Sequence, residues 1–210
     1  GYQDTDSIQT FLQADIKNLT PVFDYVGMRE ARDRIKQAVD YGESFVIYGD
    51  FDCDGVSRTA ILYMFLSSLG AEVNFYIPNR KKEGYGINRD ALEEIADTYY
   101  PDLIITVDCG ITSKEDIDYA VNDLGIDFIV TDHHEPPEIL HECIVVNPKV
   151  QRLNNTFNEL CGAGIALRLC EAIGGEKVLM YYIDLCAIAT IGDIVPLQGD
   201  NRIIVSYGME

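Results

Sequence analysis

The sequence is poor in basic residues and has no tryptophan. Its 210 residues include 16 Lys and Arg against 35 Asp and Glu, so the formal net charge is −19 at pH 7. Such a balance excludes a simple basic nucleic-acid-binding module, which needs a positive surface to attract phosphates. The sequence also has no run of about eighteen apolar residues and no cationic, apolar signal pattern at its start. We therefore expect neither membrane association nor export.

Cysteine occurs six times, but never as a C-x-x-C pair. Several of these cysteines lie in apolar stretches typical of strands or helices. A reduced interior in a cytoplasmic protein explains this distribution better than a disulfide scaffold or a zinc site. Hydrophobic residues make up 47% of the chain and charged residues 24%, as in ordinary globular domains. The length suits one α/β domain of generous size or two small ones.

Segments typical of strands and helices alternate along most of the chain. The strand-like segments are short and nearly continuous in Val, Ile and Leu, which is typical of parallel strands buried on both faces. We therefore expect an α/β fold with a doubly wound, mostly parallel five-stranded sheet, helices on both faces and a helical C-terminal third. The expected strands are 44–48, 72–77, 103–107, 127–131 and 143–146, and the expected helices are 28–39, 58–69, 89–99, 113–124 and much of 162–191.

Acidic and imidazole side chains directly follow three of the expected strands. Asp50, Asp52 and Asp54 follow the first strand, Asp108 follows the third, and Asp132-His133-His134 follows the fourth. The carboxyl ends of parallel strands form one edge where ligands bind, so these groups are expected to converge. Carboxylates packed together repel one another, and two divalent cations would relieve that repulsion. Carboxylate oxygens with one imidazole suit Mn²⁺ or Mg²⁺ better than zinc.

Asp193 is a further candidate ligand, because it follows a helix in an apolar setting and a buried acid needs a partner. Each candidate taken alone has a simpler explanation. A single Asp after a strand usually caps a turn or a helix, and His133 and His134 could be surface or structural residues. Capping does not require three acids at alternate positions, which share one side of an extended backbone, together with an Asp-His-His on another strand. The combination therefore predicts a metal site.

Four short motifs, in this order along the chain, resemble those of the DHH phosphoesterase superfamily. Three further stretches resemble its RecJ branch, the single-strand-specific 5′ exonucleases, and the resemblance covers about residues 28 to 205. It implies an N-terminal extension at 1–27, a catalytic domain at 28–205, and at 206–210 the start of a linker to a C-terminal domain. The four motifs are Gly49-Asp50-Phe51-Asp52-Cys53-Asp54-Gly55, Val107-Asp108-Cys109-Gly110, Thr131-Asp132-His133-His134 and Gly192-Asp193-Ile194-Val195-Pro196, and the further stretches are 77–88, 146–149 and 160–164.

The resemblance also implies a role for each residue of these motifs. Asp108 would bridge two ions, His134 would face the substrate phosphate, and Asp132 would orient the imidazoles. Many superfamily members have a histidine four residues before the position of Asp52, where this sequence has Tyr48. The first site is therefore expected either to bind its ion more weakly or to recruit Asp50 or water. The implied ligands are Asp52 and Asp108 for the first ion, and Asp54, Asp108, His133 and Asp193 for the second.

The implied activity is two-metal hydrolysis of single-stranded DNA from the 5′ end, with release of 5′-mononucleotides, in DNA repair and recombination. Arg80 is expected to bind substrate phosphates, and the N–H groups of Gly162 and Gly164 at a helix start are expected to face an anion. Two divalent ions change the net charge only from −19 to −15. DNA must therefore be bound by a few groups close to the site, or by the implied C-terminal domain.

Three alternative functions are also compatible with parts of the sequence. A phosphodiesterase acting on short oligonucleotides or cyclic dinucleotides, or a pyrophosphatase, would belong to the same superfamily, although the stretch from Arg80 to Asn88 argues against it. The segment 52–56 also fits the nucleophile loop of a haloacid-dehalogenase-like phosphatase, but this leaves His133 and His134 without a role. A non-catalytic RecJ-related scaffold is slightly favoured by Tyr48 and the acidic composition, but the presence of the acidic and imidazole ligands weighs against it; these are Asp52, Asp54, Asp108, His133 and Asp193. The sequence leaves the oligomeric state and the metal used in the cell open.

Overall fold

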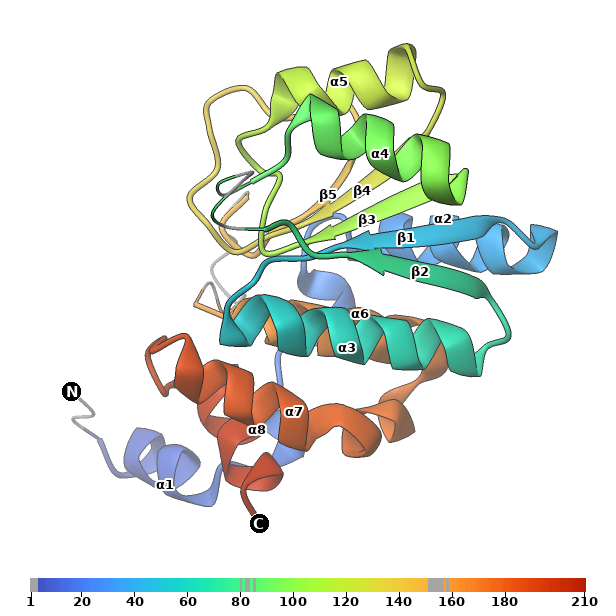
Figure 1. Cartoon of the computed structure of the whole chain (residues 1–210). Coiled ribbons are helices and arrows are strands. Elements are labelled where there is room, and N and C mark those ends of the chain that lie inside the picture. Colours follow the sequence, from blue (N-terminus) through green and yellow to red (C-terminus); the bar gives the residue numbers. More distant parts are fainter. Residues whose placement is uncertain (1–3, 80, 82–83, 85, 151–156, 158) are drawn as a thin grey trace.

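The computed structural model describes residues 4–79, 81, 84, 86–150, 157 and 159–210. Its centre is a five-stranded sheet with the order β2-β1-β3-β4-β5, in which every pair of neighbouring strands is parallel (Figure 1). The predicted α/β class and five-stranded sheet are confirmed, and the sheet is parallel throughout. The strands are β1 (Ser44–Tyr48), β2 (Glu72–Tyr76), β3 (Leu103–Val107), β4 (Asp127–Thr131) and β5 (Ile144–Val146).

The direction in which the chain adds strands reverses once. From β1 the chain moves outward to β2, then returns past β1 to β3 and continues outward to β4 and β5. In an open parallel sheet a reversal of this kind leaves a crevice at the carboxyl ends of the two strands beside it. Those strands are β1 and β3, and Asp50 and Asp108 follow them closely.

Helices cover both faces of the sheet, as predicted. Alternate residues of β1 point to opposite faces, so Phe45 and Ile47 join one hydrophobic cluster while Val46 and Tyr48 join the other. All five residues of β3 are buried, because the strand lies in the middle of the sheet with helices on each side. The first face carries α2 (Met28–Tyr41), α3 (Cys53–Ser68) and α6 (Gly162–Gly174), and the second carries α4 (Arg89–Tyr99) and α5 (Lys114–Asn122) (Figure 1).

The final third of the chain is helical, which confirms the prediction. A 3-10 helix at Glu176–Val178 follows α6 and leads into α7 (Leu179–Gly192) and then α8 (Gly199–Gly208). Helix α7 packs against α3, α6 and α8, so this bundle forms a further layer outside the first face of the sheet (Figure 1). Buried residues of α6 and α7 belong to the same hydrophobic cluster as α3.

The boundary of α3 differs from the prediction. The helix begins at Cys53, five residues before the expected start, because Asp52 is its N-cap and accepts a hydrogen bond from the Gly55 N–H at 2.7 Å. Asp54 therefore lies in the first turn of a helix. The expectation that Asp50, Asp52 and Asp54 share one side of an extended backbone is wrong for Asp54. Asp52 also performs the capping role that is the simpler explanation for an acid after a strand.

A segment near the N-terminus is anchored to α8 by a buried carboxylate. The backbone N–H and the hydroxyl of Thr20 donate to Asp200 at 3.0 and 3.1 Å, and the Tyr25 hydroxyl donates to it at 2.9 Å. Arg168 of α6 donates to the Thr20 carbonyl. We call these four residues the Thr20/Asp200 clamp. The segment also contains α1 (Thr5–Gln13) and 3-10 helices at Ile16–Asn18 and Val22–Asp24, and the division at residue 27 stays a prediction.

The structure also bears on the cysteines and on the absence of long apolar runs. All six cysteines carry free thiols, and four of them are buried. Burial and the charges of Asp132 and Asp108 raise the pKa of the Cys109 thiol well above its usual value, which makes it a packing residue and not a nucleophile. None of the helices in the described part of the chain has both the length and the apolar character that crossing a bilayer requires.

Candidate metal centre

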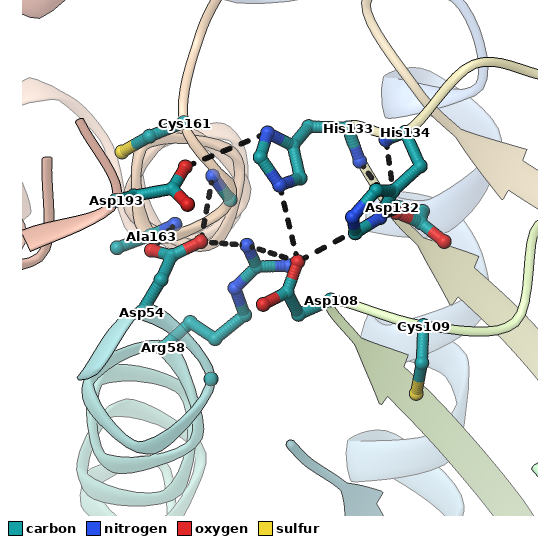
Figure 2. Close-up of polar contacts among 12 residues, drawn as sticks. Asp54, Arg58, Asp108, Cys109, Asp132, His133, His134, Cys161, Ala163 and Asp193 are labelled. Carbon is teal, nitrogen blue, oxygen red and sulfur yellow. Dashed lines mark hydrogen bonds and ion pairs between the residues drawn. The ribbon is translucent and has the colours of Figure 1, made fainter. Parts of the chain in front are cut away.

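The structure brings the predicted acidic and imidazole groups together at the carboxyl ends of β1, β3 and β4, beside the start of α6 and the end of α7 (Figure 2). Three sets of side chains offer ligand atoms that lie within 4.8 Å of one another. Oxygen and imidazole donors at such distances could hold divalent cations. The sets are Asp50, Asp52 and Asp108; Asp54, His133 and Asp193; and Asp108, His133 and His134.

Asp108 stands at the centre of the cluster. Its φ is +65°, a left-handed conformation that is uncommon outside glycine but accessible to aspartate. Its N–H donates to the Thr131 carbonyl at 3.2 Å, which fixes this turn beside β4. The carboxylate oxygen Oδ1 lies 3.0 Å from Arg58 Nη2 and 3.1 Å from His133 Nε2. The unusual backbone therefore turns the carboxylate toward groups from α3 and from the loop after β4.

Asp54 faces Asp108 from the first turn of α3. Its carboxylate accepts hydrogen bonds from the N–H groups of Gly162 and Ala163, at 3.2 and 2.9 Å, at the beginning of α6 (Figure 2). A helix N-terminus attracts a negative charge, so the beginning of α6 is a favourable position for this carboxylate. The N–H groups of Gly162 and Gly164 were expected to face an anion of the substrate. In the structure Gly162 binds the protein's own Asp54, and the Gly164 N–H donates to Cys161 Sγ at 3.3 Å.

Asp132 organises the two histidines. Its Oδ1 accepts the backbone N–H groups of His133 and His134, at 2.7 and 3.1 Å, and lies 2.7 Å from His134 Nδ1. The other oxygen accepts the Ile111 N–H at 3.1 Å. Burial opposes ionisation, but the hydrogen bonds and charge of His134 lower the pKa of Asp132. Asp132 thus holds the His134 ring directly and His133 through its backbone, which leaves the His133 ring directed at Asp108 (Figure 2).

Two carboxylates of the cluster, the buried Asp50 and the partly buried Asp193, each have one buried oxygen without a hydrogen-bond partner in the described part of the chain: Oδ1 of Asp50 and Oδ2 of Asp193. Burial and the neighbouring charges of Asp52 and Asp108 raise the pKa of Asp50. Burial and the charges of Asp54 and Asp108 raise the pKa of Asp193 to about 6, although His133 Nδ1 lies 3.8 Å from it. The two oxygens belong to different ligand sets, so a cation in each set would satisfy them, and the residues present fit a centre of two metal ions.

Arg58 belongs to the centre and was not among the residues singled out from the sequence. It is fully buried, and its Nη2 contacts Asp54 Oδ2 as well as Asp108 Oδ1 (Figure 2). Burial opposes its charge, but Asp54 and Asp108 outweigh burial and raise the pKa of Arg58. A signal was present in the sequence, since Arg58 follows Asp54 by four residues, the spacing at which side chains meet on a helix.

Arg80 and Tyr48 contribute no ligand atom to these sets. Arg80 lies outside the described residues. Tyr48 is buried in the second hydrophobic cluster, where its hydroxyl donates to the Gly86 carbonyl at 3.0 Å. Its side chain therefore lies on the face of the sheet that α4 and α5 cover. Asp50, one of the two expected replacements, groups with Asp52 and Asp108.

A model of the DHH family, N-terminal domain, matches residues 44–190, which include every residue of the three sets except Asp193. The chain belongs to the DHH family. The chain is 43% identical over 211 residues to the single-stranded-DNA-specific exonuclease RecJ of Bacillus subtilis, an alignment that covers 100% of the chain and 26% of that protein. It is 37% identical to the RecJ of Thermus thermophilus over 87% of the chain and 27% of that protein.

Solved structures agree with this assignment. The DHH domain superposes with a TM-score of 0.81 on a crystal structure of exonuclease RecJ bound to manganese, at 36% identity over 88% of this chain and 48% of that one. A RecJ from Thermus thermophilus in complex with Mn²⁺ gives a TM-score of 0.79 at 33% identity, over 90% of this chain and 28% of that one. The predicted resemblance to RecJ is thereby confirmed. The chain spans about a quarter of the two curated RecJ proteins.

Proposed function

We propose that this DHH domain is the catalytic part of a metal-dependent exonuclease that digests single-stranded DNA from the 5′ end and releases 5′-mononucleotides. The observation that carries the proposal is the convergence of carboxylates and one imidazole from β1, β3, β4 and α7 on Asp108. The substrate class is supported by the similarity to RecJ proteins, which are named single-stranded-DNA-specific exonucleases.

Two divalent cations, Mn²⁺ or Mg²⁺, fit this site. Asp50, Asp52 and Asp108 would hold one of them, and the second would lie among Asp108 and the ligands from α3, β4 and α7, which are Asp54, His133 and Asp193. When bound, such cations neutralise charge on a phosphodiester and lower the pKa of a water molecule. Manganese is supported by the solved RecJ structures that contain it.

The residues around the cations position them and the substrate. Asp132 fixes the His134 ring through Nδ1, and this half-exposed ring is placed to meet a phosphate oxygen of the substrate. The α6 N-terminus fixes Asp54 through two backbone hydrogen bonds. Because these supports are backbone groups and a buried carboxylate, Asp54 and the His134 ring are held in place before substrate binds, which limits the cost of reorganising them during reaction.

The binding of the DNA strand must be local, since the net charge of the chain is −19. Arg80 is proposed to bind substrate phosphates, and a domain on the carboxyl side of residues 28–205 is proposed to help enclose the strand. The RecJ proteins of Bacillus subtilis and Thermus thermophilus are about four times longer than the segment they share with this chain, which supports such a domain. A cytoplasmic location and a role in DNA repair and recombination belong to the same proposal.

The test is a nuclease assay with 5′-phosphorylated single-stranded DNA, the matching duplex and a cyclic dinucleotide, each with Mn²⁺. We expect 5′-mononucleotides from the single strand, and at least a hundredfold loss of rate in Asp193→Asn. Asp184→Asn is the matched control, because Asp184 lies on the same helix but is exposed.

Two results would contradict the proposal and favour a different function. Hydrolysis of the dinucleotide without release of mononucleotides from a long strand would favour a phosphodiesterase of small nucleotides. No uptake of Mn²⁺ in a calorimetric titration, or equal uptake after Asp108→Ala, would favour a non-catalytic scaffold.

A further inference from the structure

We propose that the guanidinium of Arg58 is an internal cation of the metal centre, placed between Asp54 and Asp108 where a divalent ion must compete with it. The inference rests on the proposed metal-binding function of this site. It concerns the number of divalent ions that the site holds and the affinity for each.

The contacts of Arg58 are the first support. One nitrogen, Nη2, contacts Asp54 Oδ2 on α3 and lies 3.0 Å from Asp108 Oδ1 in the loop after β3 (Figure 2). These are two carboxylates to which the DHH motifs assign the same ion. A single positive group therefore bridges the two carboxylates that the second divalent ion would bridge.

The packing around Arg58 is the second support. The side chain is 0% exposed, and its head lies against the beginning of α6 at Gly162. A Cβ on Gly162 would overlap both Nη2 and Cζ of Arg58, so the glycine leaves the space that the guanidinium fills. Nε and Nη1 of Arg58 are buried without hydrogen-bond partners in the described part of the chain. The two carboxylates are therefore what compensates the buried positive charge.

The remaining hydrogen bonds of Asp54 make it harder for a divalent ion to compete with Arg58 for this carboxylate. Besides Arg58, Asp54 accepts the N–H groups of Gly162 and Ala163, so three donors already occupy its two oxygens. A divalent ion bound to Asp54 and Asp108 would lie about 2 Å from each ligand oxygen and hence next to the guanidinium. Like charges at that separation repel, and the repulsion is strong where water is excluded. Binding there requires Arg58 to withdraw.

The first ion site is less affected. The ion pairs of Arg58 within the described residues go to Asp54 and Asp108, and not to Asp50 or Asp52. Asp50 has a buried oxygen without a hydrogen-bond partner in that part of the chain, so it gains from an ion without losing an existing bond. We therefore expect one divalent ion to bind tightly beside Asp50 and Asp52, and the second to bind weakly.

The experiment is a Mn²⁺ titration of the metal-depleted chain, followed by calorimetry and by electron paramagnetic resonance, which detects coupled pairs of Mn²⁺. In the wild type we expect one tight ion and a second at least tenfold weaker. Arg58→Ala should take up two ions, with the second affinity raised at least tenfold and a coupled-pair signal at lower Mn²⁺ concentration. Arg58→Lys keeps the charge and should behave as the wild type. Arg89→Ala removes a charge from an exposed side chain on α4 and is the matched control.

A chemical-rescue measurement separates competition from a structural effect. Millimolar methylguanidinium should lower the affinity of Arg58→Ala for the second Mn²⁺ and leave the wild type unchanged, since the same charged group would return to the same space. Arg58→Gln, which keeps a longer and polar side chain without the charge, serves if the alanine variant does not fold. Equal affinities for two ions in the wild type, Arg58→Ala and Arg58→Gln would overturn the inference alone. Absence of Mn²⁺ binding in the wild type and every variant would overturn the proposed function and the inference with it.

Discussion

Replacing Asp54 by alanine is expected to lower the free energy of unfolding by about 3–5 kcal/mol, the cost of removing one partner from a buried ion pair. The structure gives the reason. The change leaves the fully buried Arg58 with Asp108 as its remaining carboxylate, and it frees the N–H groups of Gly162 and Ala163 at the beginning of α6. The loss is a large share of a total stability that is about 5–15 kcal/mol in ordinary domains.

Arg58→Met is expected to cost less, about 1–3 kcal/mol, because Asp54 keeps two backbone donors and Asp108 keeps His133 nearby. The double variant should be more stable than the sum of the two losses predicts, with a coupling energy of about 1–3 kcal/mol. Lys114 and Asp118 form the matched control pair, since they have the same spacing of four residues and a 2.8 Å ion pair, but are partly exposed. Their coupling should be much weaker, because water screens the charges.

The assay is urea unfolding at pH 7.5 and 25 °C in the presence of EDTA, followed by circular dichroism for the wild type, the single variants and the double variants. Losses from Asp54→Ala and Arg58→Met that add within about 0.5 kcal/mol would refute the reasoning, because they would mean that the two charges do not stabilise each other. A loss below about 1 kcal/mol for Asp54→Ala would refute it as well.

Three further predictions concern the fold. Asn88→Ala should lower the free energy of unfolding by about 1 kcal/mol through loss of the cap on the Ala91 N–H, and Asn88→Ser should restore most of it in the same urea assay. His141 is buried with Nε2 3.1 Å from the Ile111 carbonyl, and burial lowers the pKa of its ring. The unfolded chain therefore takes up the proton at a higher pH than the folded chain does, and the free energy of unfolding should fall as the pH drops through about 6.5. Equal changes in that free energy between pH 7.5 and 5.5 in the wild type and His141→Gln would contradict this. Asp200→Asn weakens the Thr20/Asp200 clamp, so limited proteolysis between residues 13 and 27 should become faster, as measured by mass spectrometry. An unchanged cleavage rate would show that the carboxylate does not anchor the segment.

The strands could be predicted because burial on both faces leaves a simple pattern in the sequence, whereas their order in the sheet was not predicted and comes from the structure. The bounds of β1, β3 and β4 agree with the expected segments 44–48, 103–107 and 127–131, each a nearly continuous apolar run. Helix α4 also agrees, since Asn88 marks its beginning with a capping side chain. The start of α3 was wrong because Cys53 to Gly55 has the composition of a loop. Only the hydrogen bond from Gly55 to Asp52 shows that the helix begins there.

The identity of the ligand groups could be predicted from which residues follow each strand, but the supports of those ligands could not. Arg58 is buried because Asp108 approaches it from β3 and Gly162 leaves space for it on α6. Both residues are distant from Arg58 in the sequence, so the residues next to Arg58 do not reveal either contact. The same holds for the start of α6, where a glycine-rich sequence indicates an anion but not which one. The structure supplies Asp54, a residue of the chain itself.

The Thr20/Asp200 clamp joins positions that are 180 residues apart. During synthesis on the ribosome, the segment around Thr20 emerges early, but its partner on α8 is translated only after the whole sheet. The entropic cost of closing so long a loop rises only slowly with the loop's length. The time before the clamp can form is therefore set by how long translation takes to reach α8, and not by the entropy of bringing the two segments together. The segment around Thr20 must therefore wait until α8 has been synthesised before the clamp can close.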